Sequence, residues 1–341
     1  MWLPAWHHAW TLGSEIAEYP SMGVTLIMSL LLAFSMETGM AGTTQDKQRR
    51  VGVVAHRGAG AGASRPERPP ENTVQACLWG WGQGAPWVEC DVILSGDGVP
   101  VVRHDFSTER CADVSVDVSK STLQELQSLD VGSWKDQRWT GLGVSTLGEV
   151  LAVVPDDCGL VIEIKSGPES AGPVIEAIRA GDADFDRLMI ISFNIDTLRA
   201  IRKGCPEVPV LWLMSFKQQQ QGEDTPPAWT VSWRSGAGQG NRIEQPLDLE
   251  AIIAEVTREG FDGLDTTVAH PRDLAAKLHG SGLILGVWTV NDPQVAVKLV
   301  QSGVDEITTD DPPAVIQALA EAGMEVHCWP RRRLRTKPPA E

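Results

Sequence analysis

The sequence predicts an α/β protein whose main domain is a (β/α)8 TIM barrel, a closed ring of parallel strands with helices outside. Three observations support this fold class. Strand-like and helix-like segments alternate from residue 51 onward, which is typical of parallel β-α units. Residues 51–325 have room for eight such units, and a barrel of this kind needs about 250 residues. Several helix-like segments end in glycine, the expected helix stop.

The expected strands are rich in apolar residues and lie at residues 51–55, 87–94, 99–103, 159–165, 187–192, 208–214, 261–265, 283–290 and 304–308. Helix-like segments separate most of them, among them ENTVQACLWGWG, STLQELQSLD, NIDTLRAIRKG, DLEAIIAEVTREG, PRDLAAKLHGSG and DPQVAVKLVQSG. After the second strand, Asp97 and Gly98 have the chemistry of a tight hairpin turn. We therefore expect a small hairpin insertion there. Residues 216–246 are rich in glutamine, glycine and proline, so we expect a long βα loop with a short strand or hairpin around Trp229 to Trp233.

The two ends of the chain differ from residues 51–325 in composition. Residues 1–50 form an N-terminal extension, in which the apolar segment 23–36 is short for a membrane span. Acidic residues precede this segment, whereas a signal peptide begins with positive charge. A cytoplasmic location is therefore favoured, while secretion or membrane contact through residues 23–36 stays open. Residues 326–341 form a basic, proline-rich tail that we expect to be solvated.

Composition restricts the partners of the chain. The formal net charge is -16, and an acidic surface repels phosphate backbones, so we expect no nucleic-acid binding. A small phosphate substrate stays open, because local charges at a site outweigh the sum. The six cysteines include no C-x-x-C pair, so we expect free thiols rather than a zinc site or a disulfide framework. The sequence carries no signal for the oligomeric state.

A glycine-rich loop follows the first expected strand. Gly58, Gly60 and Ala63 fit the G-x-G-x-x-A spacing of a dinucleotide-binding turn. Such a turn opens a long helix, but prolines follow from position 66 onward, and no acidic residue lies near position 80 for a ribose hydroxyl. We therefore expect the spacing to be accidental. The side chains before the first glycine are the better candidates for function.

Two expected strands carry acidic residues among apolar neighbours. In WVECDVIL, Glu89 and Asp91 lie two residues apart, so their side chains share one face. In GLVIEIKSG, Glu163 lies among valine and isoleucine. A divalent cation would offset the repulsion, and an all-oxygen ligand set selects Mg²⁺ or Ca²⁺ over zinc. Lys165 would then neutralise a phosphate oxygen. Alternatively, the first two carboxylates face solvent, and Lys165 forms a plain salt bridge with Glu163.

Two histidines lie where a barrel places its active site. His56 ends the first expected strand and His104 ends the hairpin, and both positions belong to strand ends. A lone histidine is usually structural, but two near a metal suit a general base and a general acid. Arg57 is always charged, and its planar guanidinium suits a phosphate.

Taken together, these segments resemble the glycerophosphodiester phosphodiesterase family. The matching signatures occur in the family's order from about residue 51 to 322: AHRG (55–58), PENT (70–73), ECD (89–91), VPVVRHD (99–105), EIK (163–165), VWTVND (287–292) and GVDEITTDDP (303–312). The resemblance implies a barrel enzyme that hydrolyses glycerophosphodiesters to sn-glycerol 3-phosphate and an alcohol with one divalent cation.

The resemblance also implies roles for single residues. It makes His56 and His104 the acid–base pair. The implied metal ligands are Glu89, Asp91 and Glu163. The implied phosphate- and substrate-binding residues are Arg57, Lys165, Glu71 and Trp288. Of these, Glu71 would support the first loop, and Trp288 would line the substrate's side of the site.

Two departures from the family pattern leave the substrate's alcohol open. Twelve residues, 59–70, follow Gly58 where the family usually has a short loop, and the 216–246 segment is also long. An alternative is phospholipase D-like action on lysophospholipids or sphingomyelin in the same barrel, with Trp229 and Trp233 as an apolar rim for acyl chains. A second alternative is a non-catalytic ligand-binding barrel, which would not need this set of acids, histidines and lysine.

Overall fold

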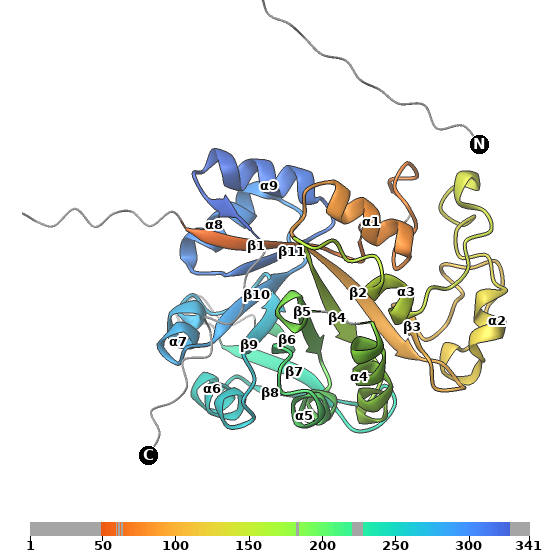
Figure 1. Ribbon diagram of the computed structural model, residues 1–341. Helices are drawn as coiled ribbons and strands as arrows, with labels where there is room; N and C mark the ends of the chain where they lie inside the picture. Colours follow the sequence, from red (N-terminus) through yellow and green to blue (C-terminus); the bar gives the residue numbers. More distant parts are fainter. Residues whose placement is uncertain are drawn as a thin grey trace, which may run out of the picture. The chain divides into compact units, whose positions relative to one another are not determined.

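Eight parallel strands close into a ring in the part of the chain that the structure describes. The structure is a computed structural model, and it describes residues 49–58, 60, 62, 64–181, 184–219 and 228–327. The ring consists of β1 (Arg50–Ala55), β2 (Trp87–Leu94), β4 (Gly159–Ile164), β5 (Leu188–Ser192), β6 (Val210–Gln218), β9 (Gly263–Thr267), β10 (Ile284–Trp288) and β11 (Glu306–Thr309). Pairing of β1 with both β2 and β11 closes it (Figure 1). The predicted (β/α)8 barrel is confirmed.

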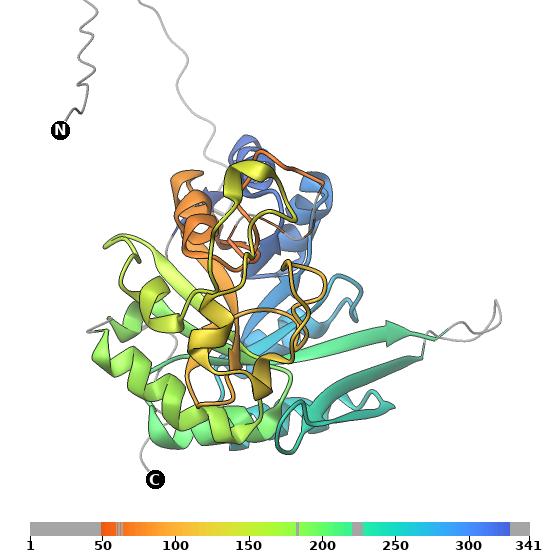
Figure 2. The same cartoon turned by 90° about the vertical axis from the view of Figure 1, so that its right-hand side faces the viewer.

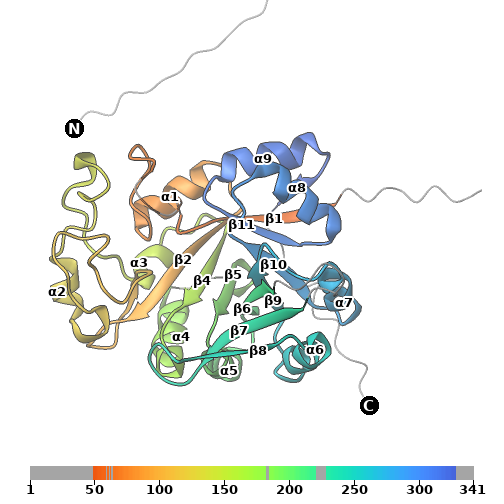
Figure 3. The same cartoon turned by 180° about the vertical axis from the view of Figure 1, so that it is seen from behind.

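Helices follow the ring strands and lie outside them (Figures 1 and 3). They are α1 (Val74–Gly82), α3 (Leu147–Leu151), α4 (Ala171–Ala180), α5 (Ile195–Gly204), α6 (Leu249–Arg258), α7 (Leu274–Gly280), α8 (Pro293–Ser302) and α9 (Pro312–Glu321), with short 3-10 turns η3 (Pro168–Ser170) and η4 (Phe185–Arg187). Thr73, Asn194 and Asp292 cap their helices by accepting first-turn amide hydrogens. Strand β12 (Glu325–Val326) pairs with β1.

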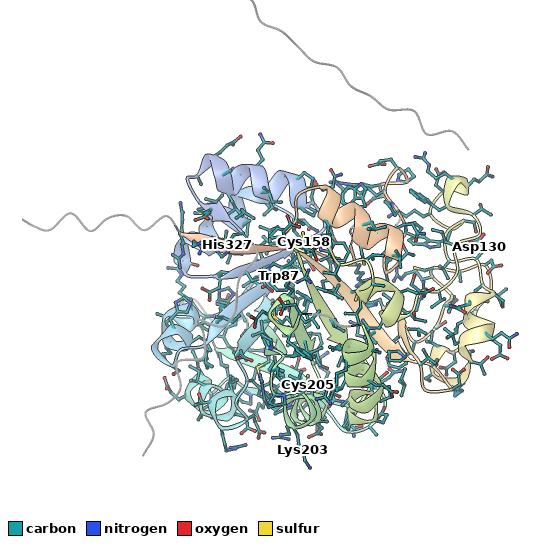
Figure 4. The ribbon with its side chains drawn as sticks, in the orientation of Figure 1. Trp87, Asp130, Cys158, Lys203, Cys205 and His327 are labelled. Carbon is teal, nitrogen blue, oxygen red and sulfur yellow. The ribbon has the colours of Figure 1, made fainter. Side chains whose placement is uncertain are left out.

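Alternating strand residues form two layers of core. The outward residues pack against the helices, and the inward residues fill the barrel. Trp87 is fully buried in the inner layer, whereas Lys203 points away from α5 (Figure 4). A Cβ at Gly159 would lie 2.1 Å from the Trp87 ring, so glycine is required on β4 where the indole crosses the barrel.

The expected hairpin after the second barrel strand is present. Strand β3 (Pro100–Val102) pairs antiparallel with β2, and Gly98 has a φ of 86° in the turn. The insertion continues beyond the hairpin through η1 (Val118–Lys120), α2 (Leu123–Gln127) and η2 (Gln137–Trp139). These pieces share a separate small core that includes Ile93 and Leu126.

The strand or hairpin expected around Trp229 to Trp233 is present, and the rest of the 216–246 segment is more regular than the loop expected from its composition. Strand β6 continues to Gln218 and pairs antiparallel with β7 (Trp229–Ser235), which pairs with β8 (Asn241–Pro246). The three strands project from the barrel as a ribbon (Figure 2). The physical reason is that side chains alternate between the two faces of a strand, so every second residue of β7 lies on the same face. Trp229, Val231 and Trp233 share that face and pack against the outer core.

The segment 23–36 and the tail beyond residue 327 lie outside the described residues, so their predicted roles stay predictions. Within the described ranges, no helix has both the length and the apolar character needed to cross a membrane. Five described cysteines are free thiols, as expected, while Cys328 lies outside the described ranges.

Candidate active site

A cavity of about 260 Å³ opens at the carboxyl ends of the barrel strands. Seven of the nine residues expected at the site line it: His56, Arg57, Glu89, His104, Glu163, Lys165 and Trp288. The other two contact residues that line the cavity: Asp91 contacts Lys165, and Glu71 contacts Arg57. The structure therefore brings together all nine residues, although they come from segments spread over the whole barrel.

The three acidic residues form one cluster. Asp91 and Glu163 are register partners on the paired strands β2 and β4, and Glu89 lies two residues before Asp91. One carboxylate oxygen from each lies within 4.8 Å of the other two. Glu89 and Asp91 are buried, with 3% and 1% of their surface exposed. The pairing of two parallel strands thus places three carboxylates around one point.

Glu89 has an oxygen without a partner. Its Oε2 accepts a hydrogen bond of 2.8 Å from the Arg57 amide, whereas its buried Oε1 contacts no donor among the described residues. Burial, and then the neighbouring charges of Asp91 and Glu163, raise the pKa of Glu89 well above its ordinary value. A buried carboxylate oxygen without a donor needs either a proton or a cation.

Asp91 is held ionised by its surroundings. Its carboxylate lies 3.1 Å from the Lys165 ammonium and 3.4 Å from the Arg57 guanidinium. The Asn72 amide adds a hydrogen bond of 2.7 Å. Burial alone would raise the pKa of Asp91, but the charges of Lys165 and Arg57 hold it well below its ordinary value. The two cations are therefore fixed beside the acidic cluster.

Glu71 organises the first loop from a buried position. Its carboxylate accepts hydrogen bonds from Arg57 at 2.7 Å, from the Gly62 amide at 2.8 Å and from both terminal nitrogens of Arg110. Burial alone would raise the pKa of Glu71, but the hydrogen bonds from Arg110 and the charge of Arg57 lower it to about 2. Glu71 thus orients Arg57 toward the cavity.

Each histidine is bonded through Nδ1 to a carboxylate. His56 Nδ1 lies 2.7 Å from Asp310, and His104 Nδ1 lies 2.6 Å from Asp105. The Asn291 amide donates to the other oxygen of Asp310 at 2.7 Å. With Nδ1 directed at a carboxylate, Nε2 of each ring is the nitrogen that can take part in proton transfer, and His56 Nε2 accepts a hydrogen bond of 3.3 Å from Arg57 Nε. Burial lowers the pKa of His104 from its ordinary value.

Sequence reasoning missed the residues that position these groups. Asn72, Asp105, Asn291 and Asp310 all lie within the family signatures PENT, RHD, VND and TTDDP, but their types alone suggested no role. Arg110 lies outside those signatures, and nothing in the sequence distinguished it from a surface arginine.

Trp288 forms an apolar wall of the cavity. Its ring meets Phe193 edge to face with the centroids 5.6 Å apart, and Ile191 and Leu213 continue the wall. Within the described ranges, the buried indole Nε1 has no hydrogen-bond partner. The cavity therefore combines one charged wall with one apolar wall.

Comparisons with known proteins show which family the chain resembles. The profile of the Glycerophosphoryl diester phosphodiesterase family matches residues 56–314. The chain is 30% identical over 276 residues to the glycerophosphodiester phosphodiesterase of Caldanaerobacter subterraneus subsp. tengcongensis, covering 80% of this chain and 98% of that one. A glycerophosphodiester phosphodiesterase of Bacillus subtilis is 25% identical, with coverage of 77% and 84%.

A solved structure supports the same assignment. The phosphodiesterase of Oleispira antarctica, determined in complex with its product sn-glycerol-3-phosphate, superposes with a TM-score of 0.62 at 26% identity. The match covers 79% of this chain and 96% of that one. The chain therefore belongs to the glycerophosphoryl diester phosphodiesterase family and is an enzyme of that family.

Proposed function

We propose that the chain hydrolyses glycerophosphodiesters to sn-glycerol 3-phosphate and an alcohol, with His56 and His104 as its acid–base pair. One observation carries the proposal: both histidines line the same cavity as Glu89, Glu163 and Lys165. General acid–base groups, a cation-binding cluster and a phosphate-binding cation are the parts that phosphodiester hydrolysis requires.

The acidic cluster fits one divalent cation, which we propose to be Mg²⁺ or Ca²⁺. Glu89, Asp91 and Glu163 offer only oxygen ligands, the type that these hard cations prefer. The partnerless Oε1 of Glu89 supports the fit, because a cation would satisfy it. When bound, the cation would supply positive charge against the phosphate oxygens and polarise the phosphorus–oxygen bond.

Lys165 and Arg57 are the proposed phosphate-binding residues. The Lys165 ammonium lies between Glu163, at 2.7 Å, and Asp91, at 3.1 Å, and its side chain is 15% exposed to the cavity. The charges of these carboxylates outweigh the effect of burial and raise the pKa of Lys165, so it stays charged. A phosphate at this point would meet two fixed cations.

The proton transfers fall to the two histidines. Nε2 of one ring removes the proton of the attacking hydroxyl, whose oxygen forms the new bond to phosphorus. Nε2 of the other ring gives a proton to the departing alcohol oxygen as its bond to phosphorus breaks. Asp310 and Asp105 would hold the rings in place and stabilise the charged form. If the attacking hydroxyl comes from water, these two transfers complete the hydrolysis. If it comes from the substrate's glycerol, they give a cyclic phosphate and the free alcohol, and water must then open the ring with the two histidines exchanging roles.

Release of glycerol 3-phosphate from a panel of diesters, measured with added metal and after exhaustive chelation, tests the proposal. We expect turnover with Mg²⁺ or Ca²⁺, loss of turnover in EDTA, and recovery when the metal returns. Full activity after exhaustive chelation would remove the metal from the proposal, and no turnover of any diester would remove the hydrolysis itself.

An assay of choline release separates the phospholipase D-like alternative, because cleavage of glycerophosphocholine and cleavage of lysophosphatidylcholine both liberate choline. Trp229 and Trp233, the expected rim for acyl chains, pack against the outer core, and neither is among the described residues that line the cavity. We therefore expect glycerophosphocholine to be cleaved faster than lysophosphatidylcholine. The opposite order would favour the alternative.

A further inference from the structure

A second cavity of about 380 Å³ adjoins the first. The two cavities share His104, Glu163, Lys165 and Phe193 as a common wall. A phosphodiester has two arms, one on each side of its phosphate. A phosphate held at Lys165 would therefore have a separate cavity available for each arm.

The β7–β8 ribbon forms one side of the second cavity and is attached to the barrel by specific hydrogen bonds. The Arg234 amide donates to the Phe193 carbonyl at 2.9 Å. The Asn194 side chain donates to the Gly236 carbonyl at 2.6 Å, and the Gly236 amide donates to Asp196 at 2.9 Å. These bonds fix the ribbon against the loop between β5 and α5, so side chains of β7 have defined positions beside the cavity.

Neighbouring side chains of β7 point in opposite directions. Trp233 packs edge to face on Trp212, with ring centroids 5.4 Å apart, on the outer side of the barrel. The next residue, Arg234, lines the second cavity. One terminal nitrogen of its guanidinium donates to the carbonyls of Gln239 and Gly240, at 3.0 and 3.1 Å, which anchors the side chain. An arginine has five N–H groups, so donors remain for a ligand.

The charges around the second cavity leave Arg234 uncompensated. The Asp105 carboxylate is paired with the Arg110 guanidinium at 2.7 Å, and the Glu163 carboxylate is paired with Lys165 at 2.7 Å. Within the described ranges, no carboxylate lies within ion-pair distance of Arg234, and its guanidinium donates to the backbone carbonyls of Gln239 and Gly240. The ribbon side of the cavity therefore carries a positive charge.

We propose that the second cavity holds the alcohol arm of the substrate and that Arg234 selects alcohols bearing an anionic group, such as a phosphate ester. Phe106 and Phe193 would pack against the carbon skeleton of the alcohol, and the guanidinium would meet the anion at its far end. A cationic alcohol such as choline would be disfavoured there. The inference rests on the proposed hydrolysis and adds the class of alcohol to it.

The test compares glycerophosphoinositol 4-phosphate, glycerophosphoinositol and glycerophosphocholine as substrates of the full chain. We expect the highest kcat/KM for the phosphorylated inositol diester. Arg234→Gln should lower that value by about 10- to 100-fold and change the other two by less than about threefold. Arg234→Lys, which keeps the charge, should retain part of the preference.

Arg242→Gln is the matched control. Arg242 lies on β8, contacts Ser232 and Glu244, and does not belong to the described lining of the cavity. It should leave all three values unchanged. An Arg234→Gln enzyme that loses activity equally on all three diesters, or keeps its activity on the phosphorylated one, would overturn the selection.

A binding measurement separates this inference from the proposed function. Calorimetry of glycerophosphoinositol 4-phosphate on His104→Ala protein, with and without Arg234→Gln, requires no turnover. Weaker binding in the double variant supports the charge at the alcohol arm, and equal binding overturns it. A wild-type chain that cleaves none of the three diesters would contradict the hydrolysis, while this calorimetry would still decide the role of Arg234.

Discussion

His56 Nδ1 lies 2.7 Å from Asp310 Oδ1, although the two residues are 254 positions apart in the chain. His56 follows β1 and Asp310 follows β11, which are neighbours because the barrel closes there. Asn291, just after β10, donates to the other Asp310 oxygen and accepts a hydrogen bond of 2.8 Å from the Asp310 amide. Three consecutive strand ends thus hold one imidazole in a single orientation.

We therefore predict that Asp310→Asn acts on catalysis through His56. The amide keeps the size of the carboxylate but loses its charge, so it holds the charged imidazole less well. We expect kcat to fall by about 100-fold with KM changed little, since partners that orient a catalytic group typically contribute 10- to 100-fold. Steady-state kinetics on a purified, folded variant measure both values.

Asp292→Asn is the matched control for this prediction. Asp292 is close to Asn291 in sequence, but its carboxylate caps α8 by accepting from the Gln294 and Val295 amides. Its loss should lower stability slightly and leave kcat unchanged. If Asp310→Asn behaves like this control, Asp310 does not position His56.

The histidines themselves give a second prediction. His56→Ala and His104→Ala should each lower kcat by about 10²- to 10⁴-fold, the usual contribution of an acid or base, and leave the fold intact. His279→Ala is a close control, because His279 also pairs with a carboxylate, Asp305, at 2.8 Å, but Asp305 precedes β11 and so lies at the opposite end of that strand from the cavity. Near-normal turnover in either cavity variant would disprove the catalytic role of that histidine.

The fold was predictable because its signals are local and repeated. Most barrel strands are short apolar runs, and several helices carry a capping residue or end at a glycine, so the number of β-α units could be read from the sequence. The β7–β8 ribbon was harder to recognise, because the glutamines and glycines around it are typical of loops. Its strand character depends on Trp229 and Trp233 finding the outer core, which is a tertiary contact.

The chemistry of the site was predictable where burial makes a residue type costly. Burying two carboxylates on one face of an apolar strand costs free energy unless a cation offsets their charge, so Glu89 and Asp91 could be recognised as functional from the sequence alone. The residues that orient His56 are not costly to place in their segments of the chain. Asp310 and Asn291 lie in a polar segment where either would be ordinary, and only the closure of β1 against β11 brings them to His56.

A third prediction concerns the metal and does not depend on activity. Mg²⁺ or Ca²⁺ at about 100 times its dissociation constant should raise the Tm of the wild-type chain by about 5 °C. Glu89→Gln should abolish this shift, because it removes a ligand at the buried centre of the cluster. Glu250→Gln, at an exposed pair with Lys277, should retain it. The same metal-induced shift in Glu89→Gln as in the wild type would contradict the assignment.

Glu71 predicts a dependence of stability on pH. Its pKa is lowered from 4.5 to about 2 in the folded chain, so its ionised form favours folding above pH 4.5. That contribution, about 3 kcal/mol at neutral pH, is lost as pH falls from 4.5 toward 2. Glu71→Gln should therefore be less stable than wild type at pH 7, and the difference should shrink between pH 4.5 and 2. Denaturant titrations across this range measure it, and a difference independent of pH would contradict it.

The last prediction concerns the close contact between the first loop and α1. Gly58 has a φ of 81°, and a Cβ there would lie 2.5 Å from the Ala76 backbone. Gly58→Ala should cost about 3 kcal/mol or more, because it adds overpacking to the strain of a left-handed backbone. Gly84 has a similar φ of 85° with open space around it, so Gly84→Ala isolates the strain, about 1 kcal/mol. Equal losses in free energy of unfolding for the two variants would show that α1 moves away, and that the contact does not constrain the loop carrying His56 and Arg57.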